Sequence, residues 1–260
     1  MNNYLCIIIS VMIFMTGCSI KEDREKCPCI LTIDISGCHE WSNDLSLKGW
    51  KGSRSLFGMS ASAKDFPEGI SISVPKGAVS YFARSPLELS RQEGRTVSIK
   101  EGNESDPLFA YRTNLVADNE EMYDKVVMHK QFANINISFA HKDGFEAGVD
   151  SVVISAQYSG LNLEDLSPVK GSFNFVSAGS DGFFSIRMPR QGEDSAIEID
   201  IMHDGEVLRE IDLSSLLSDK GYSWKDEDLD DVWLDFDIGK SAVEVGFTEW
   251  EDGVCYEKNI

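Results

Sequence analysis

A strict alternation of apolar and polar side chains, repeated many times along the 260 residues, constrains the fold of this chain most. Residues 133–139, for example, read Ala-Asn-Ile-Asn-Ile-Ser-Phe. Alternation buries one face of a strand and leaves the other in water, which is typical of antiparallel sheets. The same period of two recurs in segments 31–36, 70–74, 152–158, 184–188, 197–201, 234–238 and 243–247.

Turn signals separate these segments. Asp-Gly pairs at 143–144, 181–182 and 204–205 supply residues that tolerate positive φ, and the last pair predicts a hairpin between 197–202 and 207–211. Helical patterns are short, at 161–166 and 214–220. The stretch 41–67 is rich in Ser, Gly and Lys and shows no clear period, which predicts a long loop or an irregular edge of the first domain.

Many strands at regular spacing predict an all-β chain of sandwich architecture. The polar, glycine-bearing stretch 141–148 lies near the middle, and we place a domain boundary there. This gives two tandem antiparallel β-sandwiches, over 30–143 and 144–260, each of the usual size of about 110–120 residues.

Charge excludes one class of partner. The chain has 24 Lys and Arg against 44 Asp and Glu, which gives a net charge of −20. A nucleic-acid binder needs a basic surface, so no nucleic-acid partner is expected. A hydrophobic content of 42 % is enough for a buried core.

The N-terminus reads as an export signal. Residues 5–15 form an apolar run broken by Ser10 alone, too short for a spanning helix of about 20 residues. Residues 15–18, Met-Thr-Gly-Cys, resemble the lipobox of bacterial lipoproteins, which implies a signal peptide over 1–17, cleavage between Gly17 and Cys18, and a lipid on the Cys18 thiol. The alternative is an ordinary signal peptide, and the leader lacks the usual Lys or Arg.

A short charged segment follows the lipidation site. Lys21, Glu22 and Asp23 resemble the signal that sends Bacteroidetes lipoproteins to the outer face of the outer membrane. The alternative is that these three residues are only a solvated, charged tether. We expect residues 18–29 to form the lipidated tether between the membrane and the first sandwich. Acyl chains anchor by burying methylenes, at about 0.8 kcal/mol each, so the outer membrane is an expected partner.

Cysteines remain after the leader is removed. Cys27, Cys29 and Cys38 lie close together in the sequence, and Cys255 lies near the end. In an exported protein we expect a disulfide, Cys27 or Cys29 with Cys38. Zinc is less favoured because the spacing is not that of Cys-x-x-Cys sites, so no metal is expected here.

Motifs for catalysis and cofactors are lacking. The sequence has no Gly-x-Ser-x-Gly, His-Glu-x-x-His, Walker or dinucleotide motif, so we expect no enzyme, no catalytic residue and no cofactor. Asp226, Asp228 and Asp230 alternate as calcium ligands do, but no glycine follows at the turning position, and a solvated acidic loop is favoured. Trp41 and Trp50 lie in the irregular stretch and are the best candidates for stacking on sugars.

Residues 15–38 taken together resemble the start of Bacteroidetes fimbrial anchor lipoproteins, the minor subunits related to fimbrillins: a lipobox, a charged spacer with Arg24, a Cys-Pro-Cys run and an alternating first strand. The last alternating segment followed by Trp250 also fits this family. The resemblance implies two transthyretin-like sandwiches.

It also implies a function. The protein would hold a fimbrium on the cell surface, join a fimbrial stalk subunit by β-strand addition, and limit the length of the fibre, because a lipid-bound chain cannot add subunits beneath itself. The alternative is a surface glycan-binding lipoprotein of a polysaccharide-uptake system, in which Trp41 and Trp50 form the platform.

Overall fold

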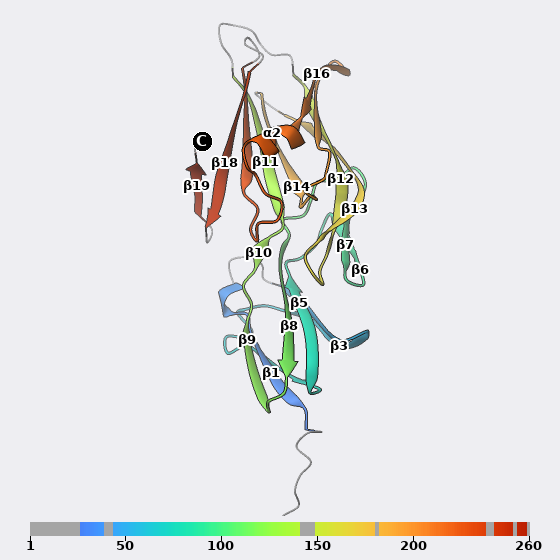
Figure 1. The fold of residues 1–260 in the computed structure, drawn as a ribbon, viewed down its shortest axis with the longest axis vertical. Helices are drawn as coiled ribbons and strands as arrows, with labels where there is room; N and C mark the ends of the chain where they lie inside the picture. Colours follow the sequence, from blue (N-terminus) through green and yellow to red (C-terminus); the bar gives the residue numbers. More distant parts are fainter. Residues whose placement is uncertain are drawn as a thin grey trace, which may run out of the picture.

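The computed structural model describes residues 27–38, 44–140, 149–179, 182–237, 242–251 and 254–258. The molecule is elongated and almost entirely β, with two sandwiches placed end to end (Figure 1). The predicted all-β fold of two sandwiches is therefore confirmed. In the described part of the chain, no helix has the length and apolar character needed to cross a membrane.

The first sandwich packs a sheet of three strands against a sheet of five. Alternate residues of both sheets point inward, among them Leu31, Leu47 and Tyr81. The small sheet has the order β4 (Ile70–Val74), β1 (Cys29–Asp34) and β9 (Glu121–Lys125). The large sheet has the order β10 (His129–Lys130), β8 (Phe109–Ala117), β5 (Gly77–Arg84), β2 (Leu45–Lys51) and β3 (Arg54–Ala61).

The second sandwich is built in the same way from later strands. One sheet has the order β14 (Phe183–Pro189), β11 (Phe132–Ala140), β17 (Asp231–Asp237), β18 (Ala242–Glu251) and β19 (Val254–Lys258). The other has the order β16 (Glu206–Asp212), β15 (Glu198–His203), β12 (Ser151–Asn162), β7 (Thr96–Ile99) and β6 (Ser90–Glu93), with β13 (Pro168–Ala178) paired to β12 as well. A 3-10 turn (Ser36–Cys38) and helix α2 (Leu213–Asp219) complete the description.

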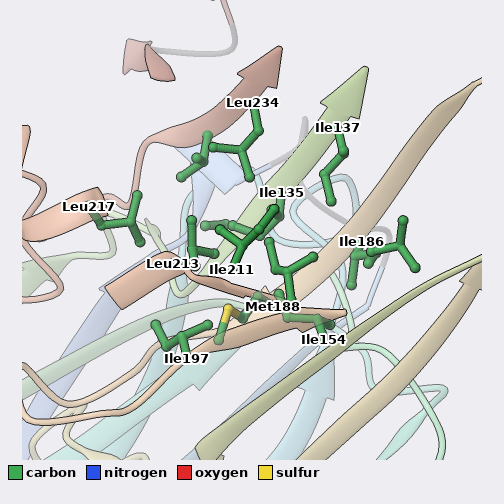
Figure 2. Close-up of a cluster of buried hydrophobic side chains, with 14 of the residues drawn as sticks. Ile135, Ile137, Ile154, Ile186, Met188, Ile197, Ile211, Leu213, Leu217 and Leu234 are labelled. Atoms are coloured by element: carbon green, nitrogen blue, oxygen red, sulfur yellow. The ribbon is translucent and has the colours of Figure 1, made fainter. Parts of the chain in front are cut away.

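Aliphatic side chains fill the second core. Figure 2 shows Ile135 and Ile137 of β11 facing the interior, with Leu213 and Leu217 of α2 nearby. Helix α2 was predicted at 214–220 and is present. It starts at an N-cap, Asp212, whose side chain accepts a hydrogen bond from the Ser215 N–H.

The strand pattern is mostly, but not wholly, antiparallel as predicted. β1 pairs with β9 in parallel, and β11 pairs with β17 in parallel. Parallel neighbours need a long crossover between them, and both pairs join strands far apart in the sequence. Alternation within one strand carries no information about the direction of its neighbour.

The boundary between the sandwiches differs from the prediction. Strand β11 was assigned to the first sandwich, but it pairs with β14 and β17 of the second. Strands β6 and β7 come from within the first half of the chain and extend the second sandwich by pairing with β12. The chain therefore enters the second sandwich at β6, returns to the first at β8, and crosses for the last time near residue 131. The predicted boundary stretch 141–148 lies outside the described residues.

Two local predictions were wrong and one was right. The stretch 41–67, expected to be irregular, contains the hairpin of β2 and β3. The apolar–polar alternation of β2 is hard to recognise because an inward position, residue 49, is a glycine. A larger residue does not fit there, since a Cβ at position 49 would lie 2.2 Å from the Phe57 ring. The segment 161–166, expected to be helical, is the end of β12 and a turn. The hairpin at Asp204-Gly205 is present, with both residues at positive φ.

Candidate functional site at the junction of the two sandwiches

A buried ion pair holds the last point at which the chain passes from the first sandwich to the second. The Lys130 ammonium lies 2.5 Å from the Asp231 carboxylate, and the lysine side chain is 1 % exposed. Asp231 also accepts hydrogen bonds from the backbone N–H of Asn134 at 2.7 Å and from its side-chain amide at 2.9 Å. A buried charge is tolerated when it is paired and hydrogen-bonded in this way.

A second carboxylate of the same loop holds the preceding residue. Asp228 accepts hydrogen bonds from the Lys130 backbone N–H at 2.6 Å and from His129 Nδ1 at 3.0 Å. The bond to Asp228 raises the pKa of His129. Burial opposes ionisation of Asp228, but its hydrogen bonds outweigh burial and lower its pKa. Both groups are therefore charged together over a wider pH range than they would be apart.

Arg190 completes this polar half of the junction. Its guanidinium donates to Gln131 Oε1 at 2.9 Å, to the Trp224 carbonyl at 2.5 Å and to the Glu227 carbonyl at 3.0 Å. Gln131 lies between the two sandwiches and donates its own amide to the His129 carbonyl at 3.1 Å. The segment 129–131 is thus bonded on several sides to the second sandwich.

The other half of the junction is apolar. Leu161 and Leu163 of the second sandwich pack on Phe82 and Ala110 of the first in a small separate core. Trp50 adjoins this core, with its ring 5.1 Å from that of Phe82. Two contact types of different chemistry therefore make a rigid joint rather than a flexible linker.

The environment of Trp50 corrects the predicted glycan platform. The Arg95 guanidinium lies 4.7 Å above the Trp50 ring and forms an ion pair with Glu164 at 2.6 Å. The ring therefore contacts both Phe82 and Arg95, and the guanidinium covers the face on which it lies, so that face is not available for stacking on a sugar. Trp41, the other half of the platform, lies outside the described residues.

A cavity opens between the two halves of the junction. Its volume is about 380 Å³. Strand β8, the crossing segment, the turn after β12 and the loop before β17 all contribute to its wall. The lining residues are Tyr111, Arg112, His129, Gln131, Asp165, Leu166, Arg190, Lys225, Asp226 and Glu227. No motif in the sequence marks this site, because its members come from five separate segments.

The acidic run behaves differently from the solvated loop that was predicted. Asp228 is tied to the junction, and Asp226 lines the cavity. The one potential metal-binding group within the described residues is exposed and consists of Asp150, His203 and Asp204, so the run does not converge as calcium ligands would.

The cysteine prediction is corrected as well. Cys27, Cys29 and Cys38 are free thiols in the structure. Cys29 begins β1 and Cys38 follows its far end, so a six-residue strand separates them. Such a strand rises about 3.3 Å per residue, far more in total than the roughly 7 Å limit between the Cα atoms of a disulfide.

The predicted lipidation and export residues lie outside the described part of the chain. They are Gly17, Cys18, Lys21, Glu22 and Asp23. The described chain starts next to β1, at the end of the first sandwich that points away from the second (Figure 1).

Open sheet edges form a second feature of interest. Most edge strands of the described residues carry charges, such as Glu206 and Glu210 on β16. Charges on an edge discourage pairing with another chain. Two edge strands differ. β4 has five residues and no charge. β3 has eight residues, its one charge is Arg54 at the start, and β2 pairs with it on one side alone.

No family model matches the chain, and no curated protein matches its sequence. The fimbrial anchor protein Mfa2 from Porphyromonas gingivalis superposes with a TM-score of 0.57 at 9 % identity, over 89 % of this chain and 99 % of that one.

The chain has the fold of a fimbrial anchor. A candidate polysaccharide-binding protein from Bacteroides thetaiotaomicron matches with a TM-score of 0.62 at 12 % identity, over 85 % of this chain and 96 % of that one. A candidate adhesin from Bacteroides ovatus matches with a TM-score of 0.59 at 11 % identity, over 90 % and 96 %. These neighbours carry structural and binding descriptions rather than enzymatic ones, and the fold predicted from the family resemblance is confirmed.

Proposed function

We propose that this protein is an outer-membrane lipoprotein that anchors a fimbrium to the cell surface. The observation that carries the proposal is the shared fold, which covers nearly the whole of both this chain and a fimbrial anchor. The N-terminal resemblance to anchor lipoproteins also supports it, because its lipobox and charged spacer are sequence features that do not depend on the fold. The role is structural and needs no catalytic residue.

The position of the N-terminus suits a tether. A lipid on Cys18 would be joined to β1 by the segment 18–29, which can span up to about 40 Å when extended. The first sandwich would then stand nearest the membrane, and the second would project outward. The net charge of −20 disfavours contact with an anionic lipid surface, so the protein would stand away from it.

The bonded junction suits a part that carries load. A fibre pulls along the axis from its tip to its anchor, and a flexible linker would let the two sandwiches separate. The Lys130–Asp231 pair, the Arg190 hydrogen bonds and the small leucine core instead hold the crossing segment from several sides.

Strand addition requires an open edge, and β3 is the edge that we assign to the stalk subunit, because it offers eight residues against the five of the uncharged edge strand β4. Its regular stretch from Phe57 to Ala61 carries no charge. The open part of β8 is less suitable, because β10 closes its upper end and the Asp118 N–H, bonded to the Val116 carbonyl, begins the turn at its lower end. An added strand would hydrogen-bond along β3, with alternate side chains toward the half-buried Phe57 and Met59.

The test of anchoring is the variant Cys18→Ala, expressed in cells that make the fimbriae. Fimbriae should be shed into the medium, while Cys27→Ala, the matched control, should keep them on the cells. Fimbriae that stay attached at normal length in Cys18→Ala would refute the proposal.

A further inference from the structure

The junction cavity has the size and position of a small-ligand site. At about 380 Å³ it falls at the lower end of the range for ligand pockets, roughly 300–1,000 Å³. Such pockets occur preferentially where two domains meet, and this one lies between the two sandwiches.

The charges of the lining are balanced. Arg112, Arg190 and Lys225 are cationic, and they face an equal number of acidic residues. The acidic residues are Asp165, Asp226 and Glu227. This balance contrasts with the net charge of −20 of the whole chain. The cavity wall therefore offers as many cationic side chains that donate hydrogen bonds as acidic side chains that accept them. A ligand that matches it must both donate and accept hydrogen bonds, as hydroxyl groups do.

Arg190 supplies fixed donors. Three of its N–H groups are used by Gln131, Trp224 and Glu227, and a guanidinium has five, so two remain. The residue is 6 % exposed, and its side chain cannot turn away without breaking the three bonds. Because the remaining donors are held in place, little conformational entropy is lost when a ligand accepts from them.

The apolar part of the wall also shows a specific geometry. Leu166 is held at a φ of 59°, a left-handed conformation that leucine rarely adopts. Strained residues of this kind cluster at functional sites. The Tyr111 hydroxyl donates its hydrogen bond to the Asp124 carboxylate at 3.0 Å within the first sandwich. Its proton is therefore not available to a ligand in the cavity.

We propose that the junction cavity binds one unit of a neutral, polyhydroxylated sugar. Its hydroxyls would accept from Arg112, Arg190 and Lys225 and donate to the acidic residues, and its C–H face would lie near Leu166. This site replaces Trp50 as the place where a glycan could bind. The inference does not rest on the anchoring role. A chain that fails to anchor a fimbrium could still bind sugar, and a chain that binds no sugar could still anchor a fimbrium.

The experiment is a calorimetric titration of the full chain with methyl glycosides of glucose, galactose, mannose and N-acetylglucosamine, and with glucuronate as an anionic probe. At least one neutral glycoside should bind saturably, with a Kd of about 1 mM or tighter. Arg112→Ala and Lys225→Ala, both exposed side chains, should each weaken binding about tenfold or more. Arg54→Ala, an exposed arginine on β3 away from the cavity, is the matched control and should bind as the unaltered chain does.

Three results would overturn the inference: no saturable binding by any neutral glycoside, binding that Arg112→Ala and Lys225→Ala leave unchanged, or a clear preference for glucuronate, which would make the cavity an anion site. Circular dichroism of each variant separates loss of the site from loss of the fold.

Discussion

Lys130 and Asp231 form an ion pair at 2.5 Å, although they lie 101 residues apart in the sequence. Lys130 ends the last strand of the first sandwich, and Asp231 begins a central strand of the second. The pair therefore joins the two cores at the last point where the chain crosses between them, after the excursion of β6 and β7 into the second sandwich. Because the pair is buried, the stability of the protein should respond strongly to the removal of either partner.

Removal of one partner of this pair should be costly. Asp231→Ala leaves the Lys130 ammonium buried without its counter-charge, and such a change destabilises proteins by about 3–5 kcal/mol. Urea unfolding followed by circular dichroism measures the loss. Asp235→Ala, on the outer face of the same strand, is the control and should cost less than about 1 kcal/mol. Equal midpoints for the two variants would show that the pair does not hold the junction.

The His129–Asp228 pair should make stability depend on pH. The folded pKa of His129 is raised above its unfolded value near 6.5, so its contribution is complete below about pH 6.5 and is lost as the pH rises through the folded pKa. The folded pKa of Asp228 is lowered, so its contribution is lost in acid. The pair is strongest between these limits.

The measurement is the urea midpoint from about pH 6 to pH 9 for the unaltered chain and for His129→Gln. The difference between them should be largest at the acidic end and shrink toward the alkaline end. His203→Gln removes a half-exposed histidine on a hairpin and serves as the control. A difference that stays constant with pH would contradict the assignment of the pair.

The strands could be predicted from the sequence, whereas their partners could not. Period-two alternation located β4, β11 and β18, because a half-buried strand imposes that pattern on its own residues. Pairing depends on residues far away: β7, from the first half of the chain, joins β12 of the second sandwich. The hairpin of β2 and β3 was missed because Gly49 occupies an inward position that the Phe57 ring fills.

The candidate site was even less accessible to sequence reasoning. The acidic run at 226–231 was noticed, but it was interpreted as solvated because neither Lys130 nor His129 is near it in the sequence. Lys130 follows His129 in a stretch with no motif, and a buried lysine looks like any other in a sequence. The one available signal was the density of carboxylates just before and at the start of the strand at 231–237. In the structure, two of these carboxylates, Asp228 and Asp231, bind His129 and Lys130.

The cysteines should react according to their burial. Cys27 is exposed and Cys29 and Cys38 are buried, and burial raises the pKa of the Cys38 thiol to about 11. A brief treatment of the native protein with iodoacetamide should therefore label Cys27 and leave Cys38 unmodified, since the thiolate is the reactive form. Peptide mass spectrometry reads the labels, and full labelling in denaturant without reductant is the control. A Cys38 that stays unlabelled in denaturant would show that it is in a disulfide after all.

The open edge of β3 should decide whether the stalk subunit is captured. Ser60→Lys places a charge on the exposed side of this strand, and inward or edge charges block strand addition. The variant should fold normally, because Ser60 is exposed, but it should retain at least tenfold fewer fimbriae on the cell surface. Val207→Lys adds the same charge to β16, an edge that already carries charges, and should retain fimbriae as before. Electron microscopy of the cells counts attached fibres, and thermal melts confirm that both variants are folded. Because the two changes add the same charge to edge strands of different sandwiches, normal retention in Ser60→Lys would rule out β3 as the acceptor while leaving the lipid tether untouched.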